Sequence, residues 1–166
     1  MAFVLSVENF ERYLALSLLL ANHNIADIRM KRIKQRGDHD CVLACIAMLG
    51  NISYEKAKIL TSNWNWNDKG PNGAATSRLL TKTLGWTIKE QNQVSLLELK
   101  HHALLIIDQG NVPYNHAVVW DCQQKRVICP SVRSFPYWNT PFIEGSLKGY
   151  QENLLFVYEI ITRKIL

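Results

Sequence analysis

Apolar positions recur at helical spacing through the first half of the chain. In residues 6–22 they leave a stripe on one side of a helix, which Asn22 and Asn24 would end. Residues 40–49 (DCVLACIAML) are almost continuously apolar, which predicts a buried helix that is capped by Asp38 or Asp40 and stops at Gly50. Both segments indicate helices that pack on a common core.

Two shorter helices are predicted next. Residues 53–62 begin with a Ser cap, and residues 76–85 run from a Thr cap to Gly85 as the C-terminal cap. The intervening residues 63–73 (NWNWNDKGPNG) have the composition of a loop. The first half of the chain is therefore predicted to be helical.

After Gly85 the pattern changes to short apolar or alternating runs, which are typical of strands. They cover residues 86–91, 102–109, 115–122, 125–130 and 154–163. The segments QGNVPYN and CQQK would be turns that join neighbouring strands. Helices followed by strands predict an α+β fold, with N-terminal helices packed on a C-terminal antiparallel sheet.

Composition narrows this picture. A chain of 166 residues that is 48% hydrophobic can form one core, so we expect a single domain over 1–166. The net charge is +5, and the one dense basic segment is RMKRIKQR, residues 29–36. We interpret it as a solvated connector, because no nucleic-acid motif accompanies it, and a nucleic-acid partner is not expected.

The N-terminal segment and the cysteines bear on the compartment. The uninterrupted apolar run LALSLLLA is too short to cross a bilayer, so residues 1–30 are expected to form an extra helix on the domain, with membrane-surface association as the alternative. Four cysteines are present without a C-x-x-C pair or a finger-spaced His pair. We expect reduced thiols in the cytoplasm and no metal or other cofactor.

The candidate chemistry centres on Cys41. It follows the predicted cap and so lies at the first turn of a helix, where the helix dipole favours a thiolate, whereas Cys45 lies one turn deeper. Gln35, a short loop earlier, could supply a side-chain amide to an oxyanion. His116, at the start of a predicted strand, is the candidate base. His39 is too close to Cys41 in sequence for that role and is expected to line the cleft.

These blocks resemble a known family. QRGDHDCVLACIAMLG is similar to the Q-x5-C segment that opens the papain-like fold, and more closely to the DCG-x-AC-x-AM block of the bacteriocin-processing, C39-type peptidases of bacteria. GAATSRLLTKTLGWTIKE and SLLELKHHALLIIDQGNVPYNHAVVWD continue the resemblance over roughly residues 35–132. The resemblance implies a stand-alone papain-like, C39-type fold with Cys41 as nucleophile, His116 as base and Gln35 in the oxyanion hole.

The chain departs from that family at two places. Where the family has an Asp followed by Pro, this chain has Cys129 before Pro130. Cys129, Ser131, Asp121 and Asn139 are therefore open candidates for the third position of the triad, although Asp121 would alternate to the opposite strand face. Val42 replaces a family Gly and is expected to narrow the cleft.

Three functions follow from these residues. The leading hypothesis is a cysteine peptidase, a thiol protease that cleaves a peptide or amide bond through a Cys–His acyl-enzyme mechanism. The first alternative is a weakened or inactive C39-like domain that binds a peptide or partner protein. The second is an acyl or peptidyl transferase that uses the same thiol. A peptide or protein substrate is expected in each case, and neither its sequence nor the oligomeric state follows from these residues.

Overall fold

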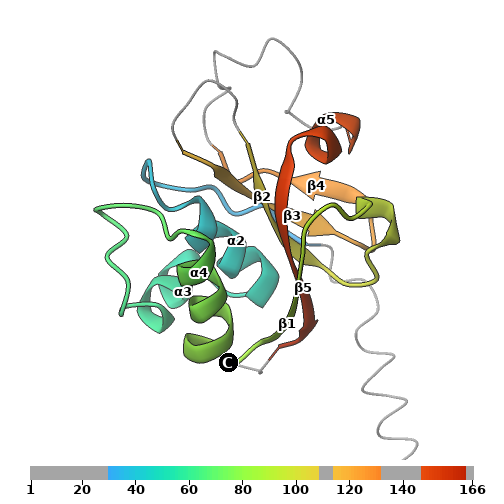
Figure 1. Ribbon diagram of the computed structural model, residues 1–166. Helices are drawn as coiled ribbons and strands as arrows, with labels where there is room; N and C mark the ends of the chain where they lie inside the picture. Colours follow the sequence, from blue (N-terminus) through green and yellow to red (C-terminus); the bar gives the residue numbers. More distant parts are fainter. Residues whose placement is uncertain (1–29, 109–113, 132–146, 164–166) are drawn as a thin grey trace, which may run out of the picture.

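The structure of the protein is a computed structural model, and it describes residues 30–108, 114–131 and 147–163. The predicted helix over 6–22 lies outside the described residues, as does Asn139. Figure 1 shows that the described part contains helices and a twisted sheet. The α+β class is therefore confirmed, while the single-domain boundary over 1–166 stays a prediction.

The two helices that follow the connector match their predictions closely. Helix α2 (Cys41–Gly50) is buried from Val42 to Leu49, and it ends where Asn51 takes a left-handed conformation with φ of 49°. Helix α3 (Tyr54–Leu60) begins at Ser53, whose hydroxyl accepts the N–H of Lys56. Asp40 occupies the cap position of α2, where its backbone carbonyl accepts the N–H of Ala44 but its side chain makes no hydrogen bond to the helix.

The third predicted helix begins earlier than the sequence suggested. Helix α4 (Gly73–Arg78) is capped by Asn72, whose side chain accepts the N–H of Ala75, so Thr76 is inside the helix and not its cap. A π-helical turn, Leu79–Thr83, extends it. Gly85 then follows with φ of 66°, a conformation that favours glycine. A 3₁₀ turn, Leu96–Glu98, comes after the first strand.

The strands form one antiparallel sheet in the described part of the chain. They are β1 (Thr87–Gln91), β2 (Ala103–Ile107), β3 (His116–Asp121), β4 (Arg126–Ile128) and β5 (Leu154–Thr162), in the spatial order β1-β5-β2-β3-β4. Neighbouring runs pair as predicted for β2 with β3 and β3 with β4. The last strand inserts between β1 and β2, and a short helix that the sequence pattern did not indicate, α5 (Leu147–Glu152), precedes it.

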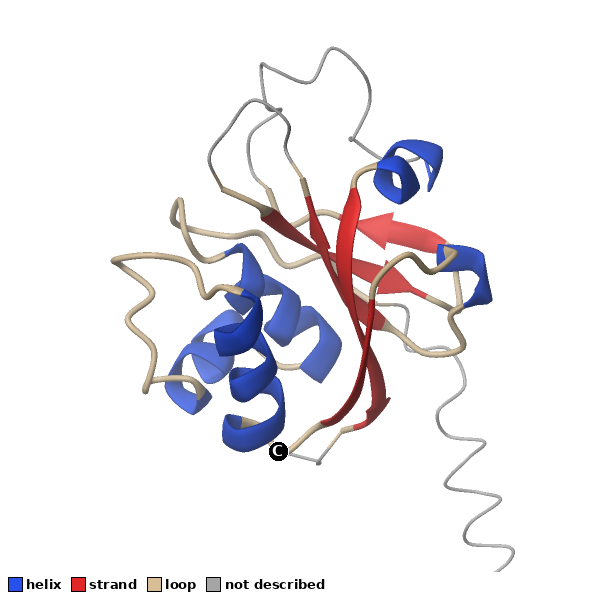
Figure 2. Cartoon of the chain, viewed as in Figure 1, coloured by secondary structure: helices blue, strands red, loops and turns tan. Residues whose placement is uncertain are grey.

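Each face of the sheet has its own core. Helices α2, α3 and α4 gather on one side of the sheet (Figure 2), where Ala117 and Val119 of β3 pack in the same cluster as α2. Val118 and Trp120 face the other way and pack with Leu96 and Tyr150. This alternation follows from the two-residue period of a strand. It brings the start of β3 next to the start of α2.

Candidate active site

The connector before α2 is fixed to the end of β4. The backbone N–H of Gln35 donates to the carbonyl of Pro130 at 2.9 Å, and Arg32 Nε donates to the carbonyl of Cys129 at 2.7 Å. A second guanidinium nitrogen of Arg32 donates to the carbonyl of Ser131. These bonds hold residues about one hundred positions apart in sequence together, so the connector that leads to α2 lies against the segment that follows β4.

Cys41 is the first residue of α2, as the sequence pattern predicted, and is half-buried. Burial raises the pKa of its thiol to about 11, although backbone N–H groups of Ala117 and Val42 oppose that rise by hydrogen bonding to the sulfur. The negative charge of Asp40 raises the pKa further. The resting thiol is therefore protonated at neutral pH.

Asp40 organises the loop that leads into the helix. Its Oδ2 accepts the backbone N–H groups of Arg36 and Gly37, at 2.9 and 3.1 Å, and the hydroxyl of Tyr54. Burial and this hydrogen bond raise the pKa of Tyr54. The loop is thus folded around the buried carboxylate of Asp40. Because Asp40 directly precedes Cys41, this carboxylate lies next to the candidate nucleophile.

His116 is the first residue of β3 and is buried. Its Nε2 lies 3.2 Å from the sulfur of Cys129. Burial lowers the pKa of the imidazole to about 4. Burial also raises the pKa of the Cys129 thiol, against the opposing effects of the Ser131 N–H and the Arg32 guanidinium. Because burial disfavours the charged form of both side chains, the imidazole of His116 and the thiol of Cys129 meet as a neutral pair.

Cys41 and His116 are neighbours without a hydrogen bond between their side chains among the described residues. The sulfur of Cys41 meets the N–H of Ala117, the residue directly after His116. By alternation, His116 shares a sheet face with Val118, whereas Ala117 faces α2. His116 therefore directly precedes the residue whose N–H contacts the Cys41 sulfur, but its own ring is turned toward Cys129.

Gln35 is buried in the connector, with its backbone bonded to Pro130, and its Nε2 donates to the carbonyl of Gly37 at 2.9 Å. Its Oε1 is buried with no hydrogen-bond partner in the described part of the chain, and so is Oδ1 of Asp40. Unpaired buried acceptors are rare in folded proteins and are costly. The amide retains one N–H that does not bond to Gly37.

The structure separates the candidates for the third position. Cys129 contacts the ring of His116, and Ser131 lies two residues on, buried. Asp121 lies at the opposite end of β3, five residues or about 16 Å away. Its carboxylate accepts from Arg126 Nε at 3.4 Å and lies 3.6 Å from Nδ1 of His102. Asp121 therefore belongs to a separate charged cluster.

Other side chains of interest differ in burial. Val42 is buried in the core cluster. His39 is exposed in the loop before Cys41. Trp66 is buried and Trp64 half-buried.

The basic connector uses part of its charge in structural contacts. Arg36 pairs with Glu55 at 2.5 Å, and its guanidinium lies 4.4 Å from the ring centre of Tyr54.

Sequence reasoning missed Arg32, Tyr54 and Ala117. Each acts through a backbone group or a contact that spans the fold, such as the bond from Arg32 to residue 129. The one available signal was the position of Ala117, directly after a candidate catalytic His, in a strand expected to face the nucleophile. No spacing rule would have identified Arg32 or Tyr54.

The remaining features concern metals, membranes and relatives. Residues 30–108, 114–131 and 147–163 contain no group of three or more His, Cys, Asp or Glu arranged to hold a metal ion. In the same ranges, no helix has the length and apolarity needed to span a bilayer. No family model and no curated protein matches the sequence.

Proposed function

We propose that the protein is a papain-like thiol hydrolase, related to the C39-type peptidases, that cleaves a peptide or amide bond. The observation that carries the proposal is the position of Cys41 at the first turn of α2, with its sulfur against the N–H of the residue after His116. A thiol at a helix N-terminus and a histidine at the start of the neighbouring strand are the residue types that nucleophilic catalysis by cysteine uses.

The contact with Cys129 supports a division of roles between the two ring nitrogens. In the proposed mechanism the His116 tautomer carries its proton on Nε2 and donates it to the sulfur of Cys129, and Nδ1 is the nitrogen that accepts a proton. Cys129 is then the positioning residue at the place of the family's Asp. The mechanism requires the imidazole, whose ring faces Cys129 in the structure, to turn toward Cys41 for proton transfer.

Acylation then follows in two steps. The proton of Cys41 passes to Nδ1 of His116, and the thiolate adds to the substrate carbonyl carbon, whose electron pair moves to oxygen. The backbone N–H of Cys41 and the unused N–H of the Gln35 amide hold that oxyanion. The oxyanion collapses, the C–N bond breaks, and the amine leaves with the proton from His116.

Water completes the cycle. It attacks the thioester carbonyl while Nδ1 of His116 takes one of its protons. The C–S bond then breaks, the carboxylic acid is released, and the proton returns to the Cys41 sulfur. If an amine replaces water at this step, the same site acts as a transferase.

The pKa values favour one second candidate. A Cys41 pKa of about 11 beside a His116 pKa of about 4 describes a site that is neutral at rest. A C39-like domain that binds a peptide without cutting it would have these properties, since it needs no thiolate.

Alkylation and cleavage separate the two candidates. The hydrolase requires His116 to activate Cys41 against the effect of burial on its pKa, so iodoacetamide at pH 7.5 should then label Cys41 ahead of Cys45, Cys122 and Cys129, as read by peptide mass spectrometry. Cys41→Ala should abolish cleavage of a peptide library, and Cys122→Ala is the matched control because that half-buried thiol lies at the other end of β3. Equal labelling of Cys41 and Cys122, together with unchanged cleavage by Cys41→Ala, would exclude the hydrolase.

A further inference from the structure

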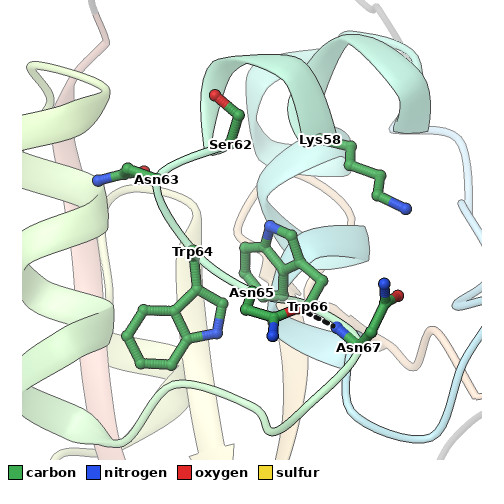
Figure 3. A pocket seen from close by; sticks show the side chains of 7 residues that line it. All are labelled: Lys58, Ser62, Asn63, Trp64, Asn65, Trp66 and Asn67. Atoms are coloured by element: carbon green, nitrogen blue, oxygen red, sulfur yellow. Dashed lines mark hydrogen bonds between the residues drawn. The ribbon is translucent and has the colours of Figure 1, made fainter.

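A pocket of about 400 Å³ lies between the end of α3 and the Asn-rich loop that follows it. Figure 3 shows the side chains that line it, which are Lys58, Ser62, Asn63, Trp64, Asn65, Trp66 and Asn67. A pocket that combines aromatic rings with several amides is suited to bind a ligand through both apolar and polar contacts.

The two tryptophan rings are held in fixed orientations. Their centroids lie 6.4 Å apart with an angle of 57° between the planes. Trp64 Nε1 donates to the carbonyl of Lys69 at 3.0 Å, and Trp66 Nε1 donates to Oγ1 of Thr61 at 3.1 Å. Because both indole N–H groups bond within the protein, the rings offer apolar surface to a ligand and no donor.

The polar groups of the pocket favour an anion. Lys58 is the one charged residue in its lining, and it makes no ion pair with a described residue. Lys58 and Asn67 lie on the same side of the pocket in Figure 3, and the ends of the two side chains point toward one another. An ammonium and an amide N–H₂ in this arrangement can both donate to a carboxylate placed between them.

The same loop continues to the candidate active site. At Gly70 the backbone passes so close to the connector that a Cβ would lie 3.2 Å from the carbonyl oxygen of His39. His39 is two residues before Cys41. A substrate that occupied the pocket could therefore follow the loop toward the nucleophile.

We propose that this pocket is a substrate subsite that binds an acidic segment of a peptide. An Asp or Glu carboxylate lies between Lys58 and Asn67, and a neighbouring apolar side chain packs on the half-buried ring of Trp64. A neutral saccharide would leave the Lys58 charge unused. A single cation is too few for the phosphate contacts that bind nucleic acid. The proposal rests on the proposed peptidase function, because it concerns the substrate of that site.

Binding is best measured in a protein that cannot cut. Full-length Cys41→Ala protein is titrated into a fluorescein-labelled peptide, Gly-Leu-Asp-Leu-Gly, and into its Asn-containing analogue, and anisotropy is recorded in 50 mM salt. We expect the Asp peptide to bind about fivefold more tightly, which is the size of an exposed ion pair. Added salt should remove most of that difference.

Variants then test the assigned residues. Lys58→Gln in the same background should bring the Asp peptide to the affinity of the Asn peptide, whereas Lys89→Gln, an exposed lysine on β1, should change nothing. Binding is also followed by the intrinsic tryptophan fluorescence of the protein, with unlabelled peptide. We expect the peptide to change this fluorescence, and Trp64→Phe, which keeps an aromatic surface for folding, should remove that change.

The proposal fails if the two peptides bind equally, if Lys58→Gln has no effect, or if neutral oligosaccharides bind while both peptides do not. These outcomes are separate from the hydrolase proposal, because binding is read without cleavage. A failure to cleave any peptide by the unmodified protein, with peptide binding intact, would leave the subsite and remove the hydrolase.

Discussion

Replacing Cys129 by Asp would place a carboxylate against the ring nitrogen that now meets a sulfur at 3.2 Å. The side chain would occupy a site that already contains the N–H of Ser131 and the guanidinium of Arg32, both of which favour a negative charge. If Cys129 positions His116 as proposed, this single change should convert a neutral pair into an ion pair.

The expected magnitude follows from the two pKa values. The Cys41 value of about 11 and the His116 value of about 4 differ by about seven, so transfer of the proton from thiol to imidazole costs about 9 kcal/mol before the attraction between the resulting charges is counted. An adjacent carboxylate shifts a partner's pKa by about one to three. The thiolate–imidazolium state should become about 10 to 1,000 times more populated.

An opposing effect reduces this gain. A negative charge at position 129 also raises the pKa of Cys41, as the existing thiol does when it ionises. The imidazole lies in contact with residue 129, so its stabilisation should exceed the repulsion felt by the more distant Cys41. We expect the net rise in reactivity to be about tenfold.

The assay is the rate of Cys41 alkylation by iodoacetamide between pH 5 and 9, followed by mass spectrometry. Cys129→Asn is the control, because it has the shape of Asp without the charge. Cys129→Asp should react about tenfold faster than Cys129→Asn at pH 7. Equal rates for the two variants would refute the assignment of Cys129 as the partner of the catalytic imidazole.

Three further predictions concern stability and the buried carboxylate of Asp40. Burial holds the pKa of His116 at about 4, below the ordinary value of 6.5, so between these pH values only the unfolded state binds the proton and the free energy of unfolding falls as pH falls. Urea denaturation should show a loss of about 3 kcal/mol from this group between pH 7 and 4, which His116→Gln lacks; parallel losses in both proteins would contradict the assignment. Asp40→Asn keeps an acceptor for Arg36 and Gly37 but removes the charge, so Cys41 alkylation at pH 8 should rise a few-fold, and a slower rate would contradict the electrostatic effect of Asp40. Asp40→Ala leaves those donors and Tyr54 unpaired and should lower the free energy of unfolding by about 2 to 4 kcal/mol; no loss in urea denaturation would show that Asp40 does not hold the loop.

Local patterns along the chain were enough to predict most elements. The continuous apolar run from Val42 to Leu49 predicted a helix that is buried on every side, and α2 is such a helix. The residues of β3 alternate between two cores, as expected for a strand with both faces covered. These are properties of neighbouring residues, and they depend little on the remainder of the fold. The class of fold follows from their order.

Boundaries and sheet order required more than local pattern. Asn72 displaced Thr76 as the cap of α4, since both residue types cap well and the chain uses the one whose position suits the packing of the helix. The insertion of β5 between β1 and β2 pairs residues 47 to 75 positions apart, which no local signal specifies.

The sequence by itself determined which residues could carry chemistry: a cysteine at a helix start, a histidine at a strand start and an amide a short loop before the cysteine. Tertiary structure alone decided that His116 meets Cys129, that Asp121 belongs to a distant cluster, and that Asp40 puts a buried anion beside the thiol. The physical reason is that residue type limits what a group can do, whereas its pKa and its partners depend on burial and on contacts between segments far apart in the chain.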